Sequence, residues 1–347
     1  MKKNDIKELT KKDLIEWLEN NDIKPYRAGQ IFKWLYMKQA NSFEEMTDIS
    51  KKIHIILSDN FTNDRLEIEE KEISNDGTTK YLFKLNDNYY SECVLIPGED
   101  RNTLCISTQV GCAQGCKFCL TSKGGIIRNL RCGEILSQIR DVQFDLTDQK
   151  ITNLVFMGMG EPFANSQSVL DAISAITDTD HGMKFSPRKV TVSTCGLVPE
   201  MIDFGKKSNV NLAVSLNATD NKTRDFLMPI NRKYPIEVLF DALKKYPLAP
   251  RKRITIEYIL IKGINDSNED AMRLIKLMKK IKGKLNLIPF NEHPKSQFRR
   301  PDNDTIEKFL AHFHKNSVIA TIRKSMGQDI SAACGQLDAN KRKLSEY

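Results

Sequence analysis

The chain changes its hydrophobic period twice within the first hundred residues. Residues 13–20, DLIEWLEN, and 28–38, AGQIFKWLYMK, carry apolar side chains at helical spacing among charged ones. From residue 65 to 97 the stretches RLEIEEKEIS, TKYLFKLN and YYSECVLIP instead alternate apolar and polar positions, and turn-like NDG and NDN separate them. A period near 3.6 predicts helices and a period of two predicts strands. The pattern therefore predicts a helical N-terminal module over residues 1–62 and a small antiparallel β segment over residues 63–100.

A third pattern begins at about residue 101, where short β-branched runs alternate with longer amphipathic stretches. The strand candidates, in chain order, are TLCIST, ITNLVFM, RKVTVST, VNLAVSLN, RITIEYILI, KLNLIPF and VIATIR. Helical stretches such as GEILSQIRDVQF, SVLDAISAIT and NEDAMRLIKLMKKI lie between them. Strands that alternate with helices of this length form βαβ units around a parallel sheet. We predict an α/β fold, a partial (β/α)6 barrel over residues 101–337, followed by a C-terminal tail at 338–347.

Chemically distinctive residues follow one predicted strand after another. Barrels of parallel strands carry their chemistry at the carboxyl ends of the strands. The residues expected at this rim are the cysteine cluster at 112–119, the GMGEP turn at 158–162, Ser193, Ser215 to Asn217, Asn291 and Cys334. Because they come from several strands, they predict an active site at the rim.

Three of the eight cysteines fall within GCAQGCKFC, with the spacing C-x3-C-x2-C. The thiolates of Cys112, Cys116 and Cys119 could ligate three irons of a [4Fe–4S] cluster and leave the fourth iron open to a small molecule. Structural zinc sites have four ligands, often as two C-x2-C pairs, and the sequence has no second pair. A zinc loop completed by a distant residue, or three unrelated thiols, remains the alternative. Gly111 and Gly115 suit a loop that wraps closely around a cluster, because glycine accepts positive φ.

Composition and charge narrow the class of protein. The 347 residues are 40% hydrophobic and 28% charged, which is typical of soluble globular proteins. The sequence has neither an apolar run of about 18 residues for a membrane span nor the apolar core of a secretory signal. We therefore expect a cytoplasmic protein without a membrane partner, whose cysteines are ligands or catalysts rather than structural disulfides. The formal net charge of +8 fits a polyanionic partner without requiring one.

The pattern C-x3-C-x-aromatic-C after the first barrel strand resembles the radical S-adenosylmethionine (SAM) superfamily, in which SAM binds the open iron and is cleaved to a 5′-deoxyadenosyl radical. GMGEP is similar to the segment that binds the SAM amino group in that superfamily. Several motifs, in this order between residues 25 and 337, together resemble the adenine-C2 RNA methyltransferases: LCISTQVGCAQGCKFC, RNLRCGEI, FMGMGEP, VTVSTCG, LMPIN, NLIPFN and DISAACGQL. The resemblance implies a radical SAM barrel that methylates an adenosine of 23S rRNA at the peptidyl transferase centre and, in some members, the adenosine 3′ of the tRNA anticodon.

The same resemblance implies roles for individual residues. In the family, one cysteine accepts a methyl group from a first SAM, and the radical from a second SAM removes a hydrogen from it. The methylene radical adds to adenine C2, and a second cysteine releases the product with a transient disulfide. By motif, Cys334 carries the methyl group, Cys105 resolves the adduct and Glu92 accepts a proton. The implied SAM contacts are Gly160, Glu161, Ser193, Ser215, Leu216, Asn217 (where many members have His) and Asn291.

The remaining cysteines and the basic residues have weaker assignments. Cys93, Cys132 and Cys195 match no required position, and we expect them to pack in the core. The helical N-terminal module, with Tyr26 and Trp34 among basic residues, is a candidate RNA-binding surface. Candidate phosphate contacts near the rim are Lys123, Arg128, Arg131, Arg251 to Arg253, Arg299 and Arg300.

Two rival functions stay open at this point. The sister activity methylates adenine C8 of 23S rRNA and confers antibiotic resistance with the same cysteine set. A non-catalytic iron–sulfur RNA-binding protein would need neither Cys105 nor Cys334. Besides 23S rRNA and tRNA, the radical chemistry requires an electron donor for the cluster, and we expect the protein to be a monomer.

Overall fold

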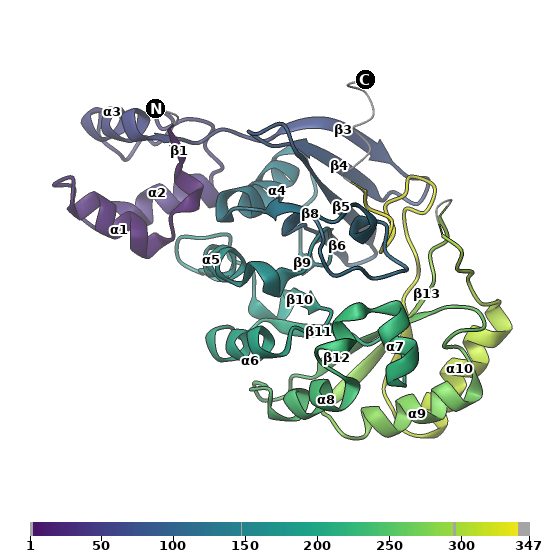
Figure 1. Ribbon diagram of the computed structural model, residues 1–347. Helices are drawn as coiled ribbons and strands as arrows, with labels where there is room; N and C mark the ends of the chain where they lie inside the picture. Colours follow the sequence, from purple (N-terminus) through teal and green to yellow (C-terminus); the bar gives the residue numbers. More distant parts are fainter. Residues whose placement is uncertain (1–2, 147, 294–295, 339–347) are drawn as a thin grey trace.

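The computed structural model describes residues 3–146, 148–293 and 296–338, in which a helical module is followed by a long curved sheet with helices along it (Figure 1). The expected tail at 338–347 lies, from residue 339 onward, outside the described residues.

The N-terminal module contains α1 (Lys11–Glu19), α2 (Arg27–Tyr36) and α3 (Lys51–Asn60). Helix α1 begins at a capping box, in which the Asp13 N–H donates to Thr10 Oγ1 and the Thr10 N–H donates to the Asp13 carboxylate, both at 3.2 Å. A short strand, β1 (Asn4–Asp5), leads into the 3₁₀ helix η1 (Ile6–Glu8) and pairs in parallel with β2 (Phe61–Thr62). The first and last residues of the module are thereby joined.

The central sheet has ten strands, and its parallel part confirms the predicted partial barrel. The parallel strands are β6 (Arg101–Cys105), β9 (Asn153–Phe156), β10 (Val190–Thr194), β11 (Asn211–Ser215), β12 (Ile254–Leu260), β13 (Gly283–Pro289) and β14 (Ala320–Ile322). Each overlaps a stretch that the hydrophobic pattern predicts to be a strand. The two outermost strands, β14 and β3 (Glu67–Ile73), do not pair with each other, so the sheet is open.

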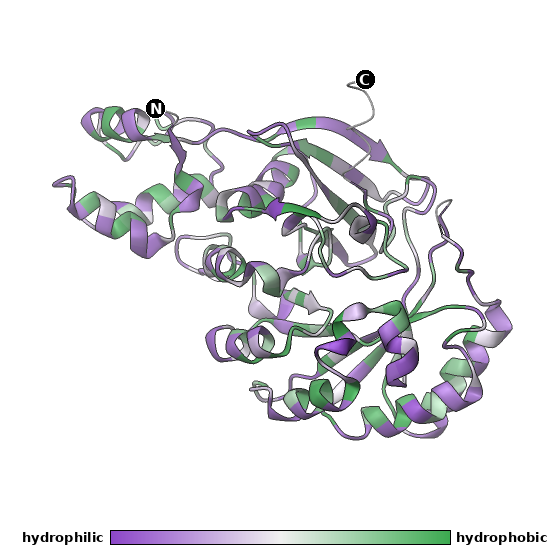
Figure 2. Ribbon diagram, in the orientation of Figure 1, coloured by the Kyte–Doolittle hydropathy of each residue, from purple (hydrophilic) through white to green (hydrophobic). Residues whose placement is uncertain are grey.

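Helices connect successive parallel strands and cover the outside of the sheet (Figure 1). They are α4 (Cys132–Asp145), α5 (Ser166–Thr177), α6 (Val198–Lys207), α7 (Asn221–Leu227), α8 (Ile236–Lys245), α9 (Asn268–Met278) and α10 (Asn303–Lys315). In Figure 2 these helices carry hydrophobic and hydrophilic stripes, as expected for elements with one face on a core. No helix in the described ranges is long and apolar enough to cross a membrane.

The antiparallel segment continues the barrel sheet. Strand β5 (Tyr90–Gly98) pairs with β4 (Thr79–Lys84) on one side and with β6, the first parallel strand, on the other. Strand β3 lies at the edge with mostly exposed, charged residues, which protect an open edge from pairing with other chains. The register places Val94 of β5 opposite Cys105 of β6, so the extension forms one wall beside the rim.

The N-terminal module packs on α4 through a buried cation. Arg140 of α4 is 1% exposed and donates to Asn63 Oδ1 at 2.8 Å and to the Ala40 carbonyl at 2.9 Å. Lys7 is fully buried and donates to the Asp64 carbonyl at 2.9 Å. Since buried carbonyls lose water on folding, these donors are what make the contact stable. Apolar side chains of the module also belong to the same hydrophobic core as the barrel.

We expect Arg140→Leu to lower the free energy of unfolding by about 3 kcal/mol, because it removes the guanidinium donors from the buried oxygens of Asn63 and one of the two donors of the Ala40 carbonyl. Urea denaturation followed by circular dichroism measures the change. Lys207→Ala, which removes an exposed pair with Asp203 on α6, is the control and should leave the urea midpoint unchanged. Equal midpoints for both variants would contradict the structural role of Arg140.

Candidate active site

The three clustered cysteines lie on a loop that leaves β7 (Gln109–Gly111) and returns as β8 (Ile126–Asn129), two strands that pair with each other. Gly111 has φ +79°, and a Cβ there would lie 2.0 Å from the Gly125 carbonyl oxygen, so only glycine fits the neck of the loop. The Cys112 N–H donates to that same oxygen at 2.8 Å. Inside the loop, the Cys119 N–H donates to the Cys116 carbonyl at 3.1 Å, which turns the chain tightly.

The surroundings of the loop are apolar. Cys116 and Cys119 pack against a cluster of buried residues formed by Phe118, Cys195, Leu227, Met228, Ile261, Phe290 and Phe298. Burial raises the pKa of Cys112 to about 12 and the pKa values of Cys116 and Cys119 above the ordinary range of a thiol. Three buried thiols become thiolates only beside a compensating cation, which an iron–sulfur cluster supplies.

The spread of the three sulfurs also favours a cluster over a single ion. Around one zinc ion at 2.3 Å, tetrahedral ligand sulfurs lie about 3.8 Å apart. Among the described residues, the only group of metal-ligand atoms lying within 4.8 Å of one another is Asp178, Asp180 and His181, far from this loop in sequence. The sulfurs of Cys112, Cys116 and Cys119 do not all lie within 4.8 Å of one another, and three thiol donors on one loop fit a cubic cluster with an open fourth iron.

The GMGEP turn after β9 is pressed against the chain that follows β6. A Cβ on Gly158 would lie 2.7 Å from Ser107 Oγ, and one on Gly160, at φ +99°, would lie 2.5 Å from Gln109 Cβ. The next residue, Glu161, is buried, and its carboxylate accepts from the Cys195 N–H at 2.8 Å and the Phe163 N–H at 3.1 Å. Burial raises its pKa. The turn thus holds one carboxyl group in the wall of a cavity, where a ligand ammonium would compensate it.

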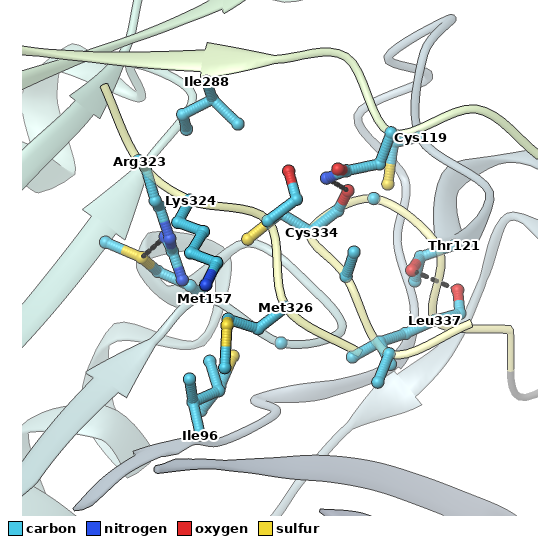
Figure 3. A pocket seen from close by; sticks show the side chains of 17 residues that line it. Ile96, Cys119, Thr121, Met157, Ile288, Arg323, Lys324, Met326, Cys334 and Leu337 are labelled. Atoms are coloured by element: carbon cyan, nitrogen blue, oxygen red, sulfur yellow. Dashed lines mark hydrogen bonds between the residues drawn. The ribbon is translucent and has the colours of Figure 1, made fainter. Parts of the chain in front are cut away.

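Two adjoining cavities, of about 150 and 110 Å³, lie at the carboxyl ends of the strands. The first is lined by all three loop cysteines together with Gly160, Glu161, Ser193 and Ser215. The second, shown in Figure 3, is lined by Cys105, Asn291, Arg323 and others. Cys119 and Cys334 line both. Cys334 therefore stands where the two cavities meet, between the cysteine loop and Cys105.

Two predicted SAM contacts do not line either cavity. The Leu216 N–H donates to the Glu257 carbonyl at 2.9 Å and its carbonyl accepts from Arg224 at 3.1 Å, so both backbone groups are engaged in the scaffold. Asn217 is fully buried at φ +58°, and its Oδ1 accepts from the Ile259 N–H at 2.8 Å. These bonds hold the end of β11 in place, and direct contact of Leu216 and Asn217 with SAM stays a prediction.

The segment that carries Cys334 is fastened to both sides of the site. Asn291 Nδ2 donates to the Cys334 carbonyl at 3.2 Å, so this predicted SAM contact holds the Cys334 loop. The Leu120 N–H donates to the Gly335 carbonyl at 2.7 Å, directly after the cysteine loop. Glu92 is buried and lines neither cavity, but its Oε2 accepts from the Asp338 N–H at 2.8 Å. The structure thus places the Glu92 carboxylate against the backbone of Asp338, just after the segment that carries Cys334.

Sequence reasoning missed several residues of the cavities. Cys195, expected to be a packing residue, lines the first cavity together with Glu257, a buried carboxyl whose pKa is raised by burial. Arg323 lines the second cavity beside Cys105 and Cys334. The signal available for Arg323 was its position directly after the last strand, the same signal that marks the other rim residues.

The structure also corrects the predicted phosphate contacts. Arg251 to Arg253 precede β12 and so lie at the amino ends of the strands, away from the rim. Arg128 is paired with Asp87 at 2.6 Å and with Glu134 at 2.7 Å, which makes it a structural cation. The sequence alone does not show at which end of the barrel a basic residue lies. That becomes clear only once the neighbouring strand and its direction are known.

Comparisons with known proteins agree with this geometry. A model described as the radical SAM superfamily matches residues 106–275, and one described as the ribosomal RNA large subunit methyltransferase N-terminal domain matches residues 4–62. The chain is 52% identical to the dual-specificity RNA methyltransferase RlmN of Desulfosudis oleivorans, over 99% of this chain and 92% of that protein. It is 51% identical to the protein of the same name from Geobacter sulfurreducens, over 96% and 91%. A crystal structure of a radical SAM methyltransferase from Sphaerobacter thermophilus superposes with a TM-score of 0.91 at 38% identity, covering 97% of this chain and all of that one.

The cysteine loop generates a direct test. Protein reconstituted anaerobically should hold about four irons and four sulfides, and Cys116→Ala should lose them because one of three ligands is gone. Cys132→Ala, a buried cysteine on α4 that lines neither cavity, is the matched control and should keep the full content. Iron and acid-labile sulfide determination gives the answer; stoichiometric zinc without sulfide in the unmodified protein would refute the cluster.

Proposed function

The chain belongs to the family of dual-specificity RNA methyltransferases RlmN, and from this premise we propose that it methylates C2 of an adenosine in 23S rRNA, at the peptidyl transferase centre, and of the adenosine 3′ of the tRNA anticodon. The observation that carries the proposal is the meeting of the two cavities. Cys334 lines both the cavity of the cysteine loop and the cavity of Cys105. A methyl carrier must face a methyl donor on one side and the residue that releases the product on the other, and Cys334 occupies that position.

The residues of the first cavity fit a cluster and SAM, the groups that supply the methyl group and the organic radical when bound. Cys112, Cys116 and Cys119 hold three irons in this proposal. Glu161 accepts the ammonium group of SAM, since its buried carboxyl needs a cationic partner. Gly160 carries no side chain because Gln109 packs against that position, and its backbone lines the same cavity. Ser193 and Ser215, on neighbouring strands, line the same cavity and offer hydroxyl groups.

Cys334 and Cys105 each form covalent bonds in a different step of the proposed reaction. Cys334 accepts and carries the methyl group, so one SAM is consumed in loading it and a second in activating it, which makes two per turnover. Cys105 attacks the Cys334 sulfur after the carbon has joined adenine, and the two sulfurs then share a disulfide. Glu92, the proton acceptor of the family pattern, would act from behind the Cys334 loop.

The proposed function also implies binding partners and a cellular compartment. The RNA substrate must approach the rim, where the cavities lie, and an electron donor must reach the cysteine loop. A thiol reductant restores Cys105 and Cys334 after each turnover. We propose that the protein acts as a monomer in the cytoplasm, where its RNA substrates are made.

Anaerobic turnover with an rRNA fragment and, separately, with tRNA tests the function. Nucleoside mass spectrometry after digestion should find 2-methyladenosine in both RNAs. 8-Methyladenosine would favour the sister C8 activity, and unmodified RNA without SAM cleavage would favour a non-catalytic iron–sulfur RNA-binding protein. Methylation of rRNA alone would remove tRNA from the proposal.

The role of Cys105 is tested by trapping. Cys105→Ala should form the carbon–carbon bond but fail to release it, so protein joined to RNA through Cys334 should survive denaturing electrophoresis and disappear after nuclease digestion. The double change Cys105→Ala, Cys334→Ala should give no adduct. Cys93→Ala, a buried cysteine of β5 that lines neither cavity, is the control and should turn over without an adduct. Normal product release by Cys105→Ala would remove Cys105 from the mechanism.

A further inference from the structure

The second cavity contains a cation that the proposed chemistry has not yet used. Arg323 follows β14, and its N–H donates to the Leu287 carbonyl of β13 at 2.8 Å, which fixes its backbone at the carboxyl end of the sheet. Its side chain lines the cavity with Cys105 and Cys334. In Figure 3 the Cys334 sulfur points toward the side of the cavity where Arg323 and Lys324 lie.

The guanidinium of Arg323 lacks the partner that a partly buried arginine usually has. Its one side-chain hydrogen bond among the described residues runs from Nη1 to the Met157 thioether sulfur, at 3.7 Å. Among the described residues it forms no ion pair within 4.0 Å, and Glu257 of β12 interacts with it electrostatically from further away. A thioether is neutral, so the guanidinium makes no direct ion pair in the cavity and has only the more distant Glu257 as an anionic neighbour. A guanidinium in this situation can bind an anionic group that enters or forms in the cavity.

We propose that Arg323 is the cation that stabilises the two reacting sulfurs, Cys334 first and Cys105 second, as thiolates. The inference rests on the proposed function, in which both sulfurs must act as nucleophiles. A thiol is a poor nucleophile and a thiolate a good one, so each step needs a positive charge near the sulfur.

The electrostatics of the three groups agree with this role. The pKa of Arg323 is held above its ordinary value chiefly by the negative charge that the Cys334 sulfur can carry, with smaller effects from Glu257 and Cys105. Burial and, to a smaller extent, nearby Cys334 raise the pKa of Cys105 to about 12, and Arg323 opposes both effects. The arginine thus interacts with both sulfurs, and Cys334 disfavours the ionised form of Cys105.

Because Cys334 and Cys105 interact with the same cation, methylation of Cys334 comes first and attack by Cys105 comes second. The Cys334 thiol loses its proton to solvent, and the thiolate attacks the methyl carbon of SAM; the new S–C bond forms as the sulfonium S–C bond breaks, and the electron pair stays on S-adenosylhomocysteine. Methylated Cys334 is neutral and no longer competes for Arg323. Cys105 then becomes the sulfur that the arginine stabilises. When it attacks the Cys334 sulfur, an S–S bond forms, and the electron pair of the broken S–C bond leaves with the carbon, which takes up a proton from solvent to become the methyl group.

The test measures thiol reactivity without SAM or RNA, so it does not depend on turnover. Protein purified without its cluster is reconstituted anaerobically with iron and sulfide, which leaves Cys334 unmethylated. Iodoacetamide then labels it at fixed pH, and peptide mass spectrometry follows each cysteine. Arg323→Gln should slow labelling of Cys334 and Cys105 by about tenfold or more, since one pKa unit is a tenfold change in thiolate fraction. Buried Cys93, which does not interact with Arg323, is the internal reference and should keep its rate.

Two further variants separate charge from structure. Arg323→Lys keeps the charge and should restore labelling to within about threefold of the original rate. Lys324→Gln removes an exposed neighbouring cation and should have less than a threefold effect, because solvent screens an exposed charge. Unchanged labelling in Arg323→Gln, equal slowing in Arg323→Lys, or a larger effect of Lys324→Gln would each overturn the proposal.

A measurement on the unsubstituted protein covers the case in which Arg323→Gln fails to fold or to bind a cluster. Labelling of Cys105 should become at least about threefold faster once Cys334 is methylated, because the competing sulfur is then neutral. An unchanged or slower rate would overturn the sharing of one cation. Adenine methylation is scored separately, so a protein that methylates no RNA but shows these labelling rates refutes the proposed function and leaves the role of Arg323 intact.

Discussion

The site depends on the hydrogen bonds that hold the last described segment, which carries Cys334, across the rim of the barrel. Cys334 follows the final strand, while the cysteine loop follows the first, and the open sheet does not bring its own ends together. Hydrogen bonds do so instead. The Gly335 carbonyl accepts from Leu120, the Leu337 carbonyl accepts from Thr121 Oγ1 at 2.7 Å, and the Gly327 N–H donates to Asp76 Oδ2 at 2.8 Å. In Figure 1 the yellow C-terminal segment accordingly runs along β3 to β5.

This fastening explains why an antiparallel extension adjoins a parallel barrel. Lys80 of β4 donates to the Ile330 carbonyl at 2.6 Å, and Ser74, just after β3, donates to Asp329 at 2.6 Å. The extension therefore supplies the surface against which the segment of Cys334 is ordered. Loop ordering costs conformational entropy, and several bonds to rigid strands offset it. Without them the Cys334 sulfur would lack a defined position relative to the cysteine loop.

The second constraint is the burial of thiol and carboxyl groups away from water, which shifts their pKa values. Burial raises the pKa values of the loop thiols, of Cys105 and of the carboxyl groups Glu161 and Glu257. Each of these groups is costly to ionise unless a cation is near. Iron, the ammonium of SAM and Arg323 are cations of three different origins that fit these three needs. The cavities are thus built to hold reactive anions only when the matching partner is present.

The sequence by itself determined what depends on local order along the chain: the strands and helices, which follow from period two and period 3.6, the cysteine loop, and the glycine turn of Gly158 and Gly160. Only the tertiary structure decided which side chains share a cavity. It brought Arg323 and Cys195 to the cavities, joined the Asn217 side chain to the Ile259 N–H, joined Glu92 to the Asp338 N–H, and placed Arg251 to Arg253 at the amino end of the barrel. The physical reason is that periodicity reports burial on one face of an element, whereas a cavity is defined by residues far apart in sequence that meet through strand order, register and the path of connecting loops.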